Sequence, residues 1–212
     1  MMFNGIVSCS DSSDNIICDG IDCQIRKEFT FNNMHLVRNC TSERCKFSAH
    51  AHTYHIEVYL KSNKLDNGGM VVDFGILKGS MKELIKMFDG AYTLWGKESE
   101  EYKKFVHDTY QKVITTEFSP SAENYAFFFY GIMSKLIKYT KFANNEGFVH
   151  LSKVRVHETH SGWAEVSQSS YYLKDNLDFN FNCPGKDILE KMKMFDEGKI
   201  FINEKPLQQI CE

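Results

Sequence analysis

The sequence lacks an excess of positive charge. Its 212 residues hold 25 lysines and arginines against 28 aspartates and glutamates, which gives a formal net charge of −3. Nucleic acids and anionic lipid surfaces attract proteins through clustered cations, so this balance gives no electrostatic reason to expect either partner. We therefore expect no nucleic acid and no membrane among the partners of the chain.

Long apolar runs and paired cysteines are also missing. No stretch reaches the ~20 apolar residues that cross a bilayer, and the start, MMFNGIVSCSDSSDN, lacks the basic and apolar parts of a secretory signal. The seven cysteines are odd in number and form no C-x-x-C pair, which argues against a disulfide framework and a cysteine-only zinc module. We expect reduced thiols and a cytoplasmic protein.

The apolar pattern predicts an α+β domain. Glycine-rich phosphate loops, nucleophile elbows and HExxH helices are absent. Two runs, RKEFTFNNMHLV and HTYHIEVYL, instead alternate with the period of two that is typical of strands. The second run places its apolar side chains on one face together with His52.

Two helices and a closing hairpin are expected to follow. Apolar residues recur at near 3.6 spacing through ILKGSMKELIKMF, and a second apolar helix is expected to begin near Pro120, Ser121 and Glu123. The charged run KESEEYKKFVHDTY is expected to be a solvated helix or loop. FVHLSKVRVHET and SGWAEVSQSSYYL then suggest an antiparallel hairpin. The order predicts a four-stranded antiparallel sheet with two helices on one face.

The two ends of the chain are expected to lie outside this domain. Residues 1–24 show little periodicity and form an N-terminal extension, and residues 25–172 form the domain. Residues 173–212 form a C-terminal extension with one short helical candidate, KDILEKMKMF. Because a four-stranded sheet leaves open edges, we also expect a homo-oligomer that forms by edge pairing.

Three histidines are candidates for a metal site. His50 and His52 stand two residues apart where a strand begins, so both imidazoles point to the same side. Catalytic zinc sites commonly use three protein ligands and leave a fourth position open, and His35, at the end of the preceding strand, is the leading third ligand. An isolated H-x-H pair is, however, more often a pair of ordinary polar residues at a strand edge.

A series of motifs surrounds these histidines in a fixed order over roughly residues 25–166. The motifs are FTFNNMH, CKFSAHAHTY, GMVVDFGILK, FDG, SPSAENYA and VRVHET. In this order they resemble the 6-pyruvoyl-tetrahydropterin synthase and 6-carboxytetrahydropterin synthase family. The resemblance implies a T-fold, assembled through sheet edges into a β-barrel as a trimer or hexamer, with active sites between subunits.

The resemblance also implies a metal and a substrate. The family's zinc ligands correspond to His35, His50 and His52, which agrees with the choice made from the residues. Glu158 corresponds to the acid that anchors the pterin, because a carboxylate can accept two parallel hydrogen bonds from the pterin's N–H groups. Glu123, in SPSAENYA, is assigned with it to substrate binding. The implied substrate is 7,8-dihydroneopterin triphosphate.

The catalytic pattern of the family is only partly present. Cys45 matches its catalytic thiol, whose thiolate would remove a side-chain proton of the substrate. Asp89 matches its catalytic aspartate, but Gly90 stands where relatives have a histidine that works with it. Positioned acid–base catalysis typically supplies ~10²–10⁴-fold in rate. Asp89 could act through water, or another residue could substitute, the candidates being Tyr92, His55, His107 and His160.

Three functions remain open on these grounds. The first is a zinc-dependent 6-carboxytetrahydropterin synthase, a carbon–oxygen lyase that serves 7-deazaguanine (queuosine) synthesis. We prefer it because the compact C-x4-H-x-H is more typical of bacterial than of animal members. The second is a 6-pyruvoyltetrahydropterin synthase of biopterin synthesis. The third is a zinc-containing pterin-binding protein with weak or no turnover, which Gly90 keeps open.

Overall fold

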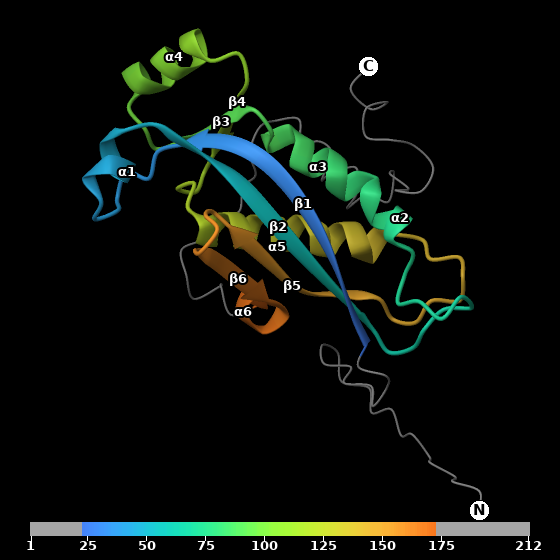
Figure 1. Cartoon of the computed structure of the whole chain (residues 1–212). Helices are drawn as coiled ribbons and strands as arrows, with labels where there is room; N and C mark the ends of the chain where they lie inside the picture. Colours follow the sequence, from blue (N-terminus) through green and yellow to red (C-terminus); the bar gives the residue numbers. More distant parts are fainter. Residues whose placement is uncertain (1–22, 173–212) are drawn as a thin grey trace, which may run out of the picture.

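The computed structural model describes residues 23–172, which form a curved sheet with helices on one of its faces (Figure 1). The strands are β1 Cys23–His35, β2 His50–Ser62, β3 Ala91–Trp95, β4 Val113–Thr116, β5 His150–His157 and β6 Trp163–Ser167. The helices are α1 Glu43–Phe47, α2 Phe74–Lys78, α3 Ser80–Phe88, α4 Glu100–Thr109, α5 Ala122–Tyr139 and α6 Gln168–Tyr172. No helix in this range combines the length and the apolar character that crossing a membrane requires.

The predicted antiparallel strands are present, but the predicted sheet of four strands is too small. The strand order is β4-β3-β1-β2-β5-β6, and β1, β2, β5 and β6 pair antiparallel as expected. Two short strands extend the sheet in parallel: β3 pairs with β1 over residues 33–35, and β4 pairs with β3. The described sheet therefore has six strands and is mixed.

The extra strands β3 and β4 stand before and after the charged segment KESEEYKKFVHDTY. The segment predicted as a solvated helix or loop contains α4, whose Val106 is fully buried against Tyr92 and Leu94 of β3. Because α4 covers this small second core, β3 and β4 can add to the edge of the sheet without exposing their apolar side chains. The helical candidate KDILEKMKMF lies outside the described residues.

The main core lies between the sheet and the two larger helices. The side chains of β1 and β2 alternate as predicted, and Tyr54, Ile56, Val58 and Leu60 of β2 are fully buried. Helix α5 packs on β5 and β6, and α3 packs on β1. Figure 1 shows both helices behind the long β1–β2 ribbon. The prediction of helices on one face is therefore confirmed.

The two core helices begin for reasons that the sequence contains. Ser121 is the N-cap of α5 and its side chain accepts a hydrogen bond from the backbone N–H of Asn124, as the segment Pro120 to Glu123 predicted. The other predicted helix is divided into α2 and α3 at Gly79. Asp73 caps α2 by accepting a hydrogen bond from the N–H of Gly75.

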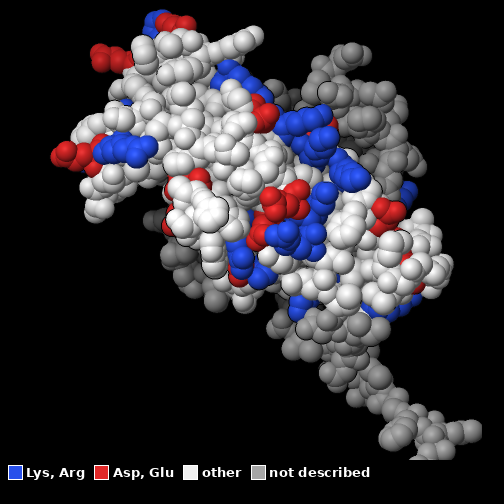
Figure 2. All heavy atoms as spheres, in the orientation of Figure 1, with Lys and Arg blue, Asp and Glu red and all other residues white. Residues whose placement is uncertain are grey.

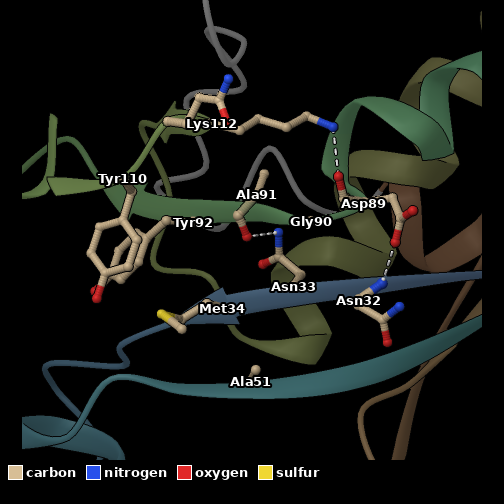
Figure 3. Close-up of a pocket in the computed structure, with 11 residues that line it drawn as sticks. Asn32, Asn33, Met34, Ala51, Asp89, Gly90, Ala91, Tyr92, Tyr110 and Lys112 are labelled. Carbon is tan, nitrogen blue, oxygen red and sulfur yellow. Dashed lines mark hydrogen bonds between the residues drawn. The ribbon is translucent and has the colours of Figure 1, made fainter.

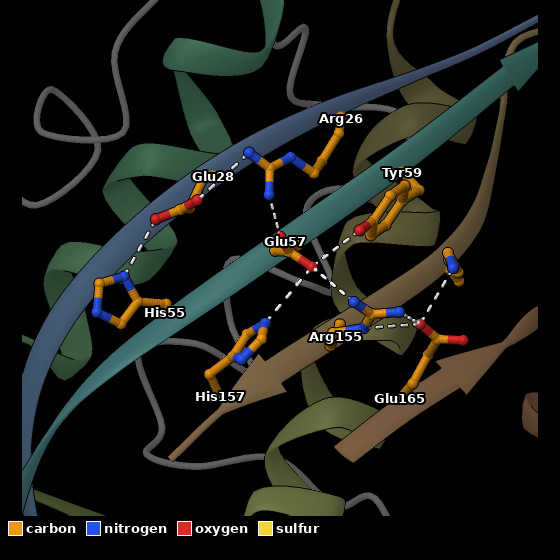
Figure 4. Close-up of polar contacts among 9 residues, drawn as sticks. Arg26, Glu28, His55, Glu57, Tyr59, Arg155, His157 and Glu165 are labelled. Carbon is orange, nitrogen blue, oxygen red and sulfur yellow. Dashed lines mark hydrogen bonds and ion pairs between the residues drawn. The ribbon is translucent and has the colours of Figure 1, made fainter. Parts of the chain in front are cut away.

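The opposite face of the sheet carries a network of balanced charges (Figure 4). Glu57, at the centre of β2, is 6% exposed and accepts hydrogen bonds from Arg26 and Tyr59, with Arg155 and His157 at ion-pair distance. Burial alone would raise the pKa of Glu57, but these partners outweigh burial and lower it. Figure 2 shows acidic and basic side chains intermingled on this face, so it offers no surface of one sign.

A buried amide joins β1 to β3 and α5. Asn33 is 2% exposed, and its Nδ2 donates to the carbonyls of Phe88 (3.0 Å) and Ala91 (2.9 Å). Its Oδ1 accepts from the hydroxyls of Thr93 (2.9 Å) and Tyr125 (2.9 Å). Asn33 thus fills both donor positions and both acceptor positions of its amide.

We predict that Asn33→Ala lowers the free energy of unfolding by roughly 2–4 kcal/mol, because it leaves buried carbonyls and hydroxyls without partners. Urea unfolding of the purified protein measures this loss. Asn32→Ala is the matched control: it removes an exposed amide from the next position of the same strand and should cost less than about 1 kcal/mol. Equal losses for the two variants would contradict the prediction.

Candidate metal centre and pterin site

The pairing of β1 with β2 brings three imidazoles to one place. His35 is directly opposite His50 in the antiparallel ladder, and His52 is opposite Asn33. Residues that are opposite one another share a face, and residues two apart share it too, so all three side chains point to the helix-covered side. Their ring centroids lie 4.7 to 5.3 Å apart. One nitrogen from each ring lies within 4.8 Å of the others.

Hydrogen bonds fix which nitrogen of two rings carries the proton. His35 Nδ1 lies 2.5 Å from the carbonyl oxygen of Pro120, and His50 Nδ1 lies 2.8 Å from that of Ser48. A carbonyl oxygen can only accept, so each Nδ1 is the donor and each Nε2 keeps its lone pair. This is the arrangement in which a backbone carbonyl orients a histidine for a metal.

The lone pair on His35 Nε2 is buried and has no hydrogen-bond donor. His35 is fully buried, and its Nε2 is the single buried side-chain nitrogen or oxygen in residues 23–172 that has no hydrogen-bond partner. Burial, with smaller contributions from His50 and His52, lowers the pKa of His35 to about 4. Burial also lowers the pKa of His52. Neutral imidazole is the form that binds a metal ion.

The donor set fits zinc. Three neutral imidazoles with converging nitrogens match the ligands of a catalytic zinc site, in which a fourth position remains for another ligand. An unmet buried nitrogen is costly unless something binds it, and a divalent cation is a partner that all three rings could share. His35, His50 and His52, the predicted ligands, are therefore the residues that could hold the ion.

Glu158 joins this cluster from the end of β5. The last pair of the β2–β5 ladder is His55 with His157, so Glu158 follows opposite Tyr54. Its Oε1 accepts a hydrogen bond from the Tyr54 hydroxyl at 3.2 Å. The same hydroxyl lies 3.2 Å from His35 Nδ1. Burial raises the pKa of Tyr54 well above its usual value, so its phenol keeps its proton and can donate it to Glu158.

The other predicted residues on this side lie farther out. Cys45 is a half-buried free thiol in α1, within the loop that connects β1 to β2, and its charged form contributes to the raised pKa of Tyr54. Val37 N–H donates to the Cys45 carbonyl at 3.0 Å, which closes this loop. Glu123 is exposed in the first turn of α5, three residues after Pro120.

Asp89 ends α3 and lies at the edge of the sheet beside β1. Its Oδ1 accepts a hydrogen bond from the backbone N–H of Asn32 at 2.8 Å, and it lines an open pocket of about 690 Å³ beside Gly90 and Lys112 (Figure 3). None of the described residues that line this pocket is a histidine. Lys112 Nζ donates to the Asp89 carbonyl at 2.5 Å, where the ammonium stabilises the C-terminal end of α3.

Gly90 adopts a backbone conformation that favours glycine. Its φ is +69°, and a Cβ built there would meet nothing within 4 Å. Of the residues considered as substitutes for the missing histidine, only Tyr92 lines the pocket, and its hydroxyl is hydrogen-bonded to that of Tyr102 at 2.9 Å. The others lie elsewhere: His55 contacts Glu28, and His107 and His160 are exposed.

Sequence reasoning missed the polar role of two residues. Tyr54 was assigned to the apolar face of β2, although its position two residues after His52 could have placed its hydroxyl at the metal site. The role of Lys112 could not be predicted, because nothing in the sequence indicates that its side chain contacts the end of α3.

The chain matches known proteins over most of its length. The family described as "6-pyruvoyl tetrahydropterin synthase" matches residues 24–169. A Helicobacter pylori protein named 6-carboxy-5,6,7,8-tetrahydropterin synthase is 36% identical over 203 residues, covering 88% of this chain and 98% of that protein.

Solved structures share the fold. An uncharacterized protein from Wolinella succinogenes superposes with a TM-score of 0.57 at 21% identity and covers 70% of this chain and 99% of its own. The 6-pyruvoyl tetrahydropterin synthase of Plasmodium falciparum gives a TM-score of 0.51 at 18% identity, with 68% and 96% covered. At these identities the likeness concerns the fold alone.

The lowered pKa of His35 predicts that the chelator-treated protein is acid-sensitive. Above pH 6.5 His35 is neutral in both the folded and the unfolded chain, whereas between pH 6.5 and about 4 only the unfolded chain takes up its proton. Stability should therefore be complete above pH 6.5 and fall by about 3 kcal/mol as the pH is lowered to about 4. Urea unfolding at a series of pH values measures this.

Two variants isolate the contribution of His35. His35→Asn can keep the hydrogen bond to Pro120 but does not titrate, so its pH dependence should be flatter by that amount. His107→Asn removes an exposed histidine and should behave as the wild type does. Equal pH dependence in all three proteins would show that the burial of His35 does not cause the effect.

Proposed function

The chain belongs to the 6-pyruvoyl tetrahydropterin synthase family, a family of lyase-type enzymes of pterin metabolism, and on that premise we propose that it is a zinc-dependent 6-carboxy-5,6,7,8-tetrahydropterin synthase. Its substrate is 7,8-dihydroneopterin triphosphate, and its product serves 7-deazaguanine (queuosine) synthesis. The name and 98% coverage of the Helicobacter pylori relative support this branch over the pyruvoyl-forming one.

The observation that carries the proposal is the buried, unmet Nε2 of His35 beside two further imidazoles. His35, His50 and His52 hold the zinc, and the carbonyls of Pro120 and Ser48 keep two of the rings in the metal-binding tautomer. When bound there, zinc supplies Lewis-acid polarisation, which makes a hydroxyl of the substrate side chain more acidic.

Glu158 anchors the pterin next to this centre. A carboxylate can accept two parallel hydrogen bonds from the amino group and a ring N–H of the pterin, which fixes the ring plane. Tyr54 donates to the same carboxylate from the buried side and keeps it pointing toward the imidazoles. The position of Glu158 at the end of β5 therefore sets the distance between the pterin ring and the metal.

Cys45 and Asp89 act on protons in sites built from more than one chain. Cys45, on the loop beside Tyr54, removes a proton from the substrate side chain as a thiolate. Asp89 accepts a hydrogen bond from the backbone N–H of Asn32 at the edge of the sheet, three positions along β1 from His35, which is about 10 Å of strand. We infer that Asp89 serves the site of a neighbouring copy in a homo-oligomer, a trimer or hexamer.

The sheet has free edges for such an assembly. Strands β4 and β6 are the outermost strands of the described sheet, and β1 pairs with β3 only over its last three residues. Among residues 23–172 no strand pairs with this edge of β1 before Asn32, and we infer that a strand of another copy pairs there. Pairing through these edges would join the curved sheets into a barrel, with the charge network around Glu57 inside it.

Gly90 supports a second candidate function, a zinc- and pterin-binding protein with slow turnover. The left-handed backbone at Gly90 projects no side chain into the pocket that holds Asp89. Asp89 therefore lacks the neighbouring imidazole that its relatives use, and a proton-transfer step worth ~10²–10⁴-fold in rate is weakened.

We predict that the zinc-loaded protein converts 7,8-dihydroneopterin triphosphate and one water to 6-carboxytetrahydropterin, triphosphate and acetaldehyde, which mass spectrometry resolves. Cys45→Ala should lower kcat by roughly 10²–10⁴-fold with little change in zinc content. Cys40→Ala, which removes a second half-buried thiol from the same loop, is the matched control and should keep full activity. Removal of zinc by a chelator should abolish turnover, and its return should restore it.

Each other outcome of this assay assigns a different function. A pyruvoyl product would assign the chain to the pyruvoyl-forming synthases. Tight pterin binding without turnover would support the binding protein. If the zinc-loaded oligomer shows no pterin binding and no turnover, pterin chemistry is excluded.

We further predict that Gly90→His raises kcat at least tenfold, because it returns an imidazole to the side of Asp89. Histidine tolerates a left-handed backbone better than most residues do, and nothing within 4 Å obstructs a Cβ there. Gly90→Ala is the control for backbone strain and should lower stability by roughly 1–2 kcal/mol without raising kcat. A kcat for Gly90→His no higher than that of Gly90→Ala would contradict a proton-transfer role for this position.

A further inference from the structure

The carboxylate of Glu158 points directly at the metal-binding nitrogens. Its Oε1 lies 3.4 Å from His35 Nε2 and 3.8 Å from His52 Nε2. The proposed zinc would bind these two nitrogens, and the same carboxylate oxygen lies near both of them. A residue assigned only to the pterin would not need this position.

A hydrogen bond does not explain the contact. Both distances exceed the usual 2.7–3.2 Å of a hydrogen bond to nitrogen. His35 Nδ1 already carries the proton that Pro120 accepts, so Nε2 has none to donate.

Shared coordination does explain the contact. Two atoms that bind one zinc ion at about 2.0–2.1 Å with tetrahedral angles lie roughly 3.3–3.4 Å apart. The 3.4 Å between Glu158 Oε1 and His35 Nε2 equals that separation, and the 3.8 Å to His52 is slightly larger. Oε1 therefore lies at the separation of two ligands of one ion from His35 Nε2 and close to that separation from His52 Nε2.

Two features hold the carboxylate there. The Tyr54 hydroxyl donates to the same Oε1. Tyr54 is itself fully buried, so the packing of the core holds its side chain in place. The backbone of Glu158 is fixed by the turn that connects β5 to β6, where its N–H donates to the Gly162 carbonyl at 3.1 Å.

We propose that Glu158 is the fourth zinc ligand of the resting site and that pterin binding withdraws it from the metal. The proposal rests on the proposed function, because it assumes that the three histidines bind zinc. Two parallel hydrogen bonds to a pterin require both carboxylate oxygens, and the Tyr54 hydroxyl and the zinc would already use both lone pairs of Oε1. Oε1 must therefore leave the metal in order to bind the pterin. The metal then gains an open position only when a pterin has arrived.

The test compares the full-length wild type with Glu158→Gln, Glu158→Ala and Tyr54→Phe. Glu101→Gln is the control, because it removes one carboxylate from exposed α4. Zinc affinity is measured by competition with a chromophoric chelator, and the visible spectrum of the cobalt-substituted protein reports the ligand set. Urea unfolding of each chelator-treated protein checks that the fold is intact.

We expect the Glu158 variants to bind zinc about 10–100-fold more weakly and to show altered cobalt spectra without any pterin present. Tyr54→Phe should change both in the same direction by less, and Glu101→Gln should change neither. Addition of 7,8-dihydrobiopterin should shift the wild-type cobalt spectrum toward that of Glu158→Gln.

Three results would overturn the proposal. Weaker zinc binding with an unchanged cobalt spectrum would mean that Glu158 acts only through its charge. Unchanged affinity and spectrum in both Glu158 variants would remove its role as a ligand while the zinc site itself stands. A wild-type protein that retains no zinc would overturn the proposed function as well.

Discussion

The structure around the three histidines depends on one buried imidazole nitrogen that has no hydrogen-bond partner in residues 23–172. A protein core rarely tolerates an unmet polar atom, and a fold that keeps one normally has a partner for it. His35 Nε2 is such an atom, and its other nitrogen is held by the carbonyl of Pro120. The end of β1, the start of β2 and the approach to α5 must therefore all be in place before the three rings converge.

The curved sheet separates two chemical environments. The helix-covered side holds the imidazoles, Tyr54 and Glu158, where burial keeps histidine neutral and tyrosine protonated. The other side holds the Glu57 network, in which opposite charges balance. A strand can serve both sides because its side chains alternate, and β1 does so within the four residues from Asn32 to His35.

The metal ligands and the long strands could be predicted from the sequence because both depend on a period of two. The short additions could not. The segment β3, AYTLW, has five residues and β4, VITT, has four, and neither is long enough to show alternation. Their pairing depends on α4, and because the sequence of α4 is highly charged, the burial of its Val106 could not be predicted. The placement of Asp89 away from the imidazoles was equally beyond prediction, because it follows from the turn at Gly90 rather than from any motif.

The ladder between β1 and β2 runs through all thirteen residues of each strand in one unbroken register. Loss or gain of a single residue inside it would turn every side chain beyond that point to the other face, and the imidazoles would leave the core for solvent. Evolution can lengthen or shorten this protein without dismantling its centre only outside the ladder. Deletions and insertions between homologues are therefore expected to gather outside the ladder, while the ribbon itself changes only by substitution.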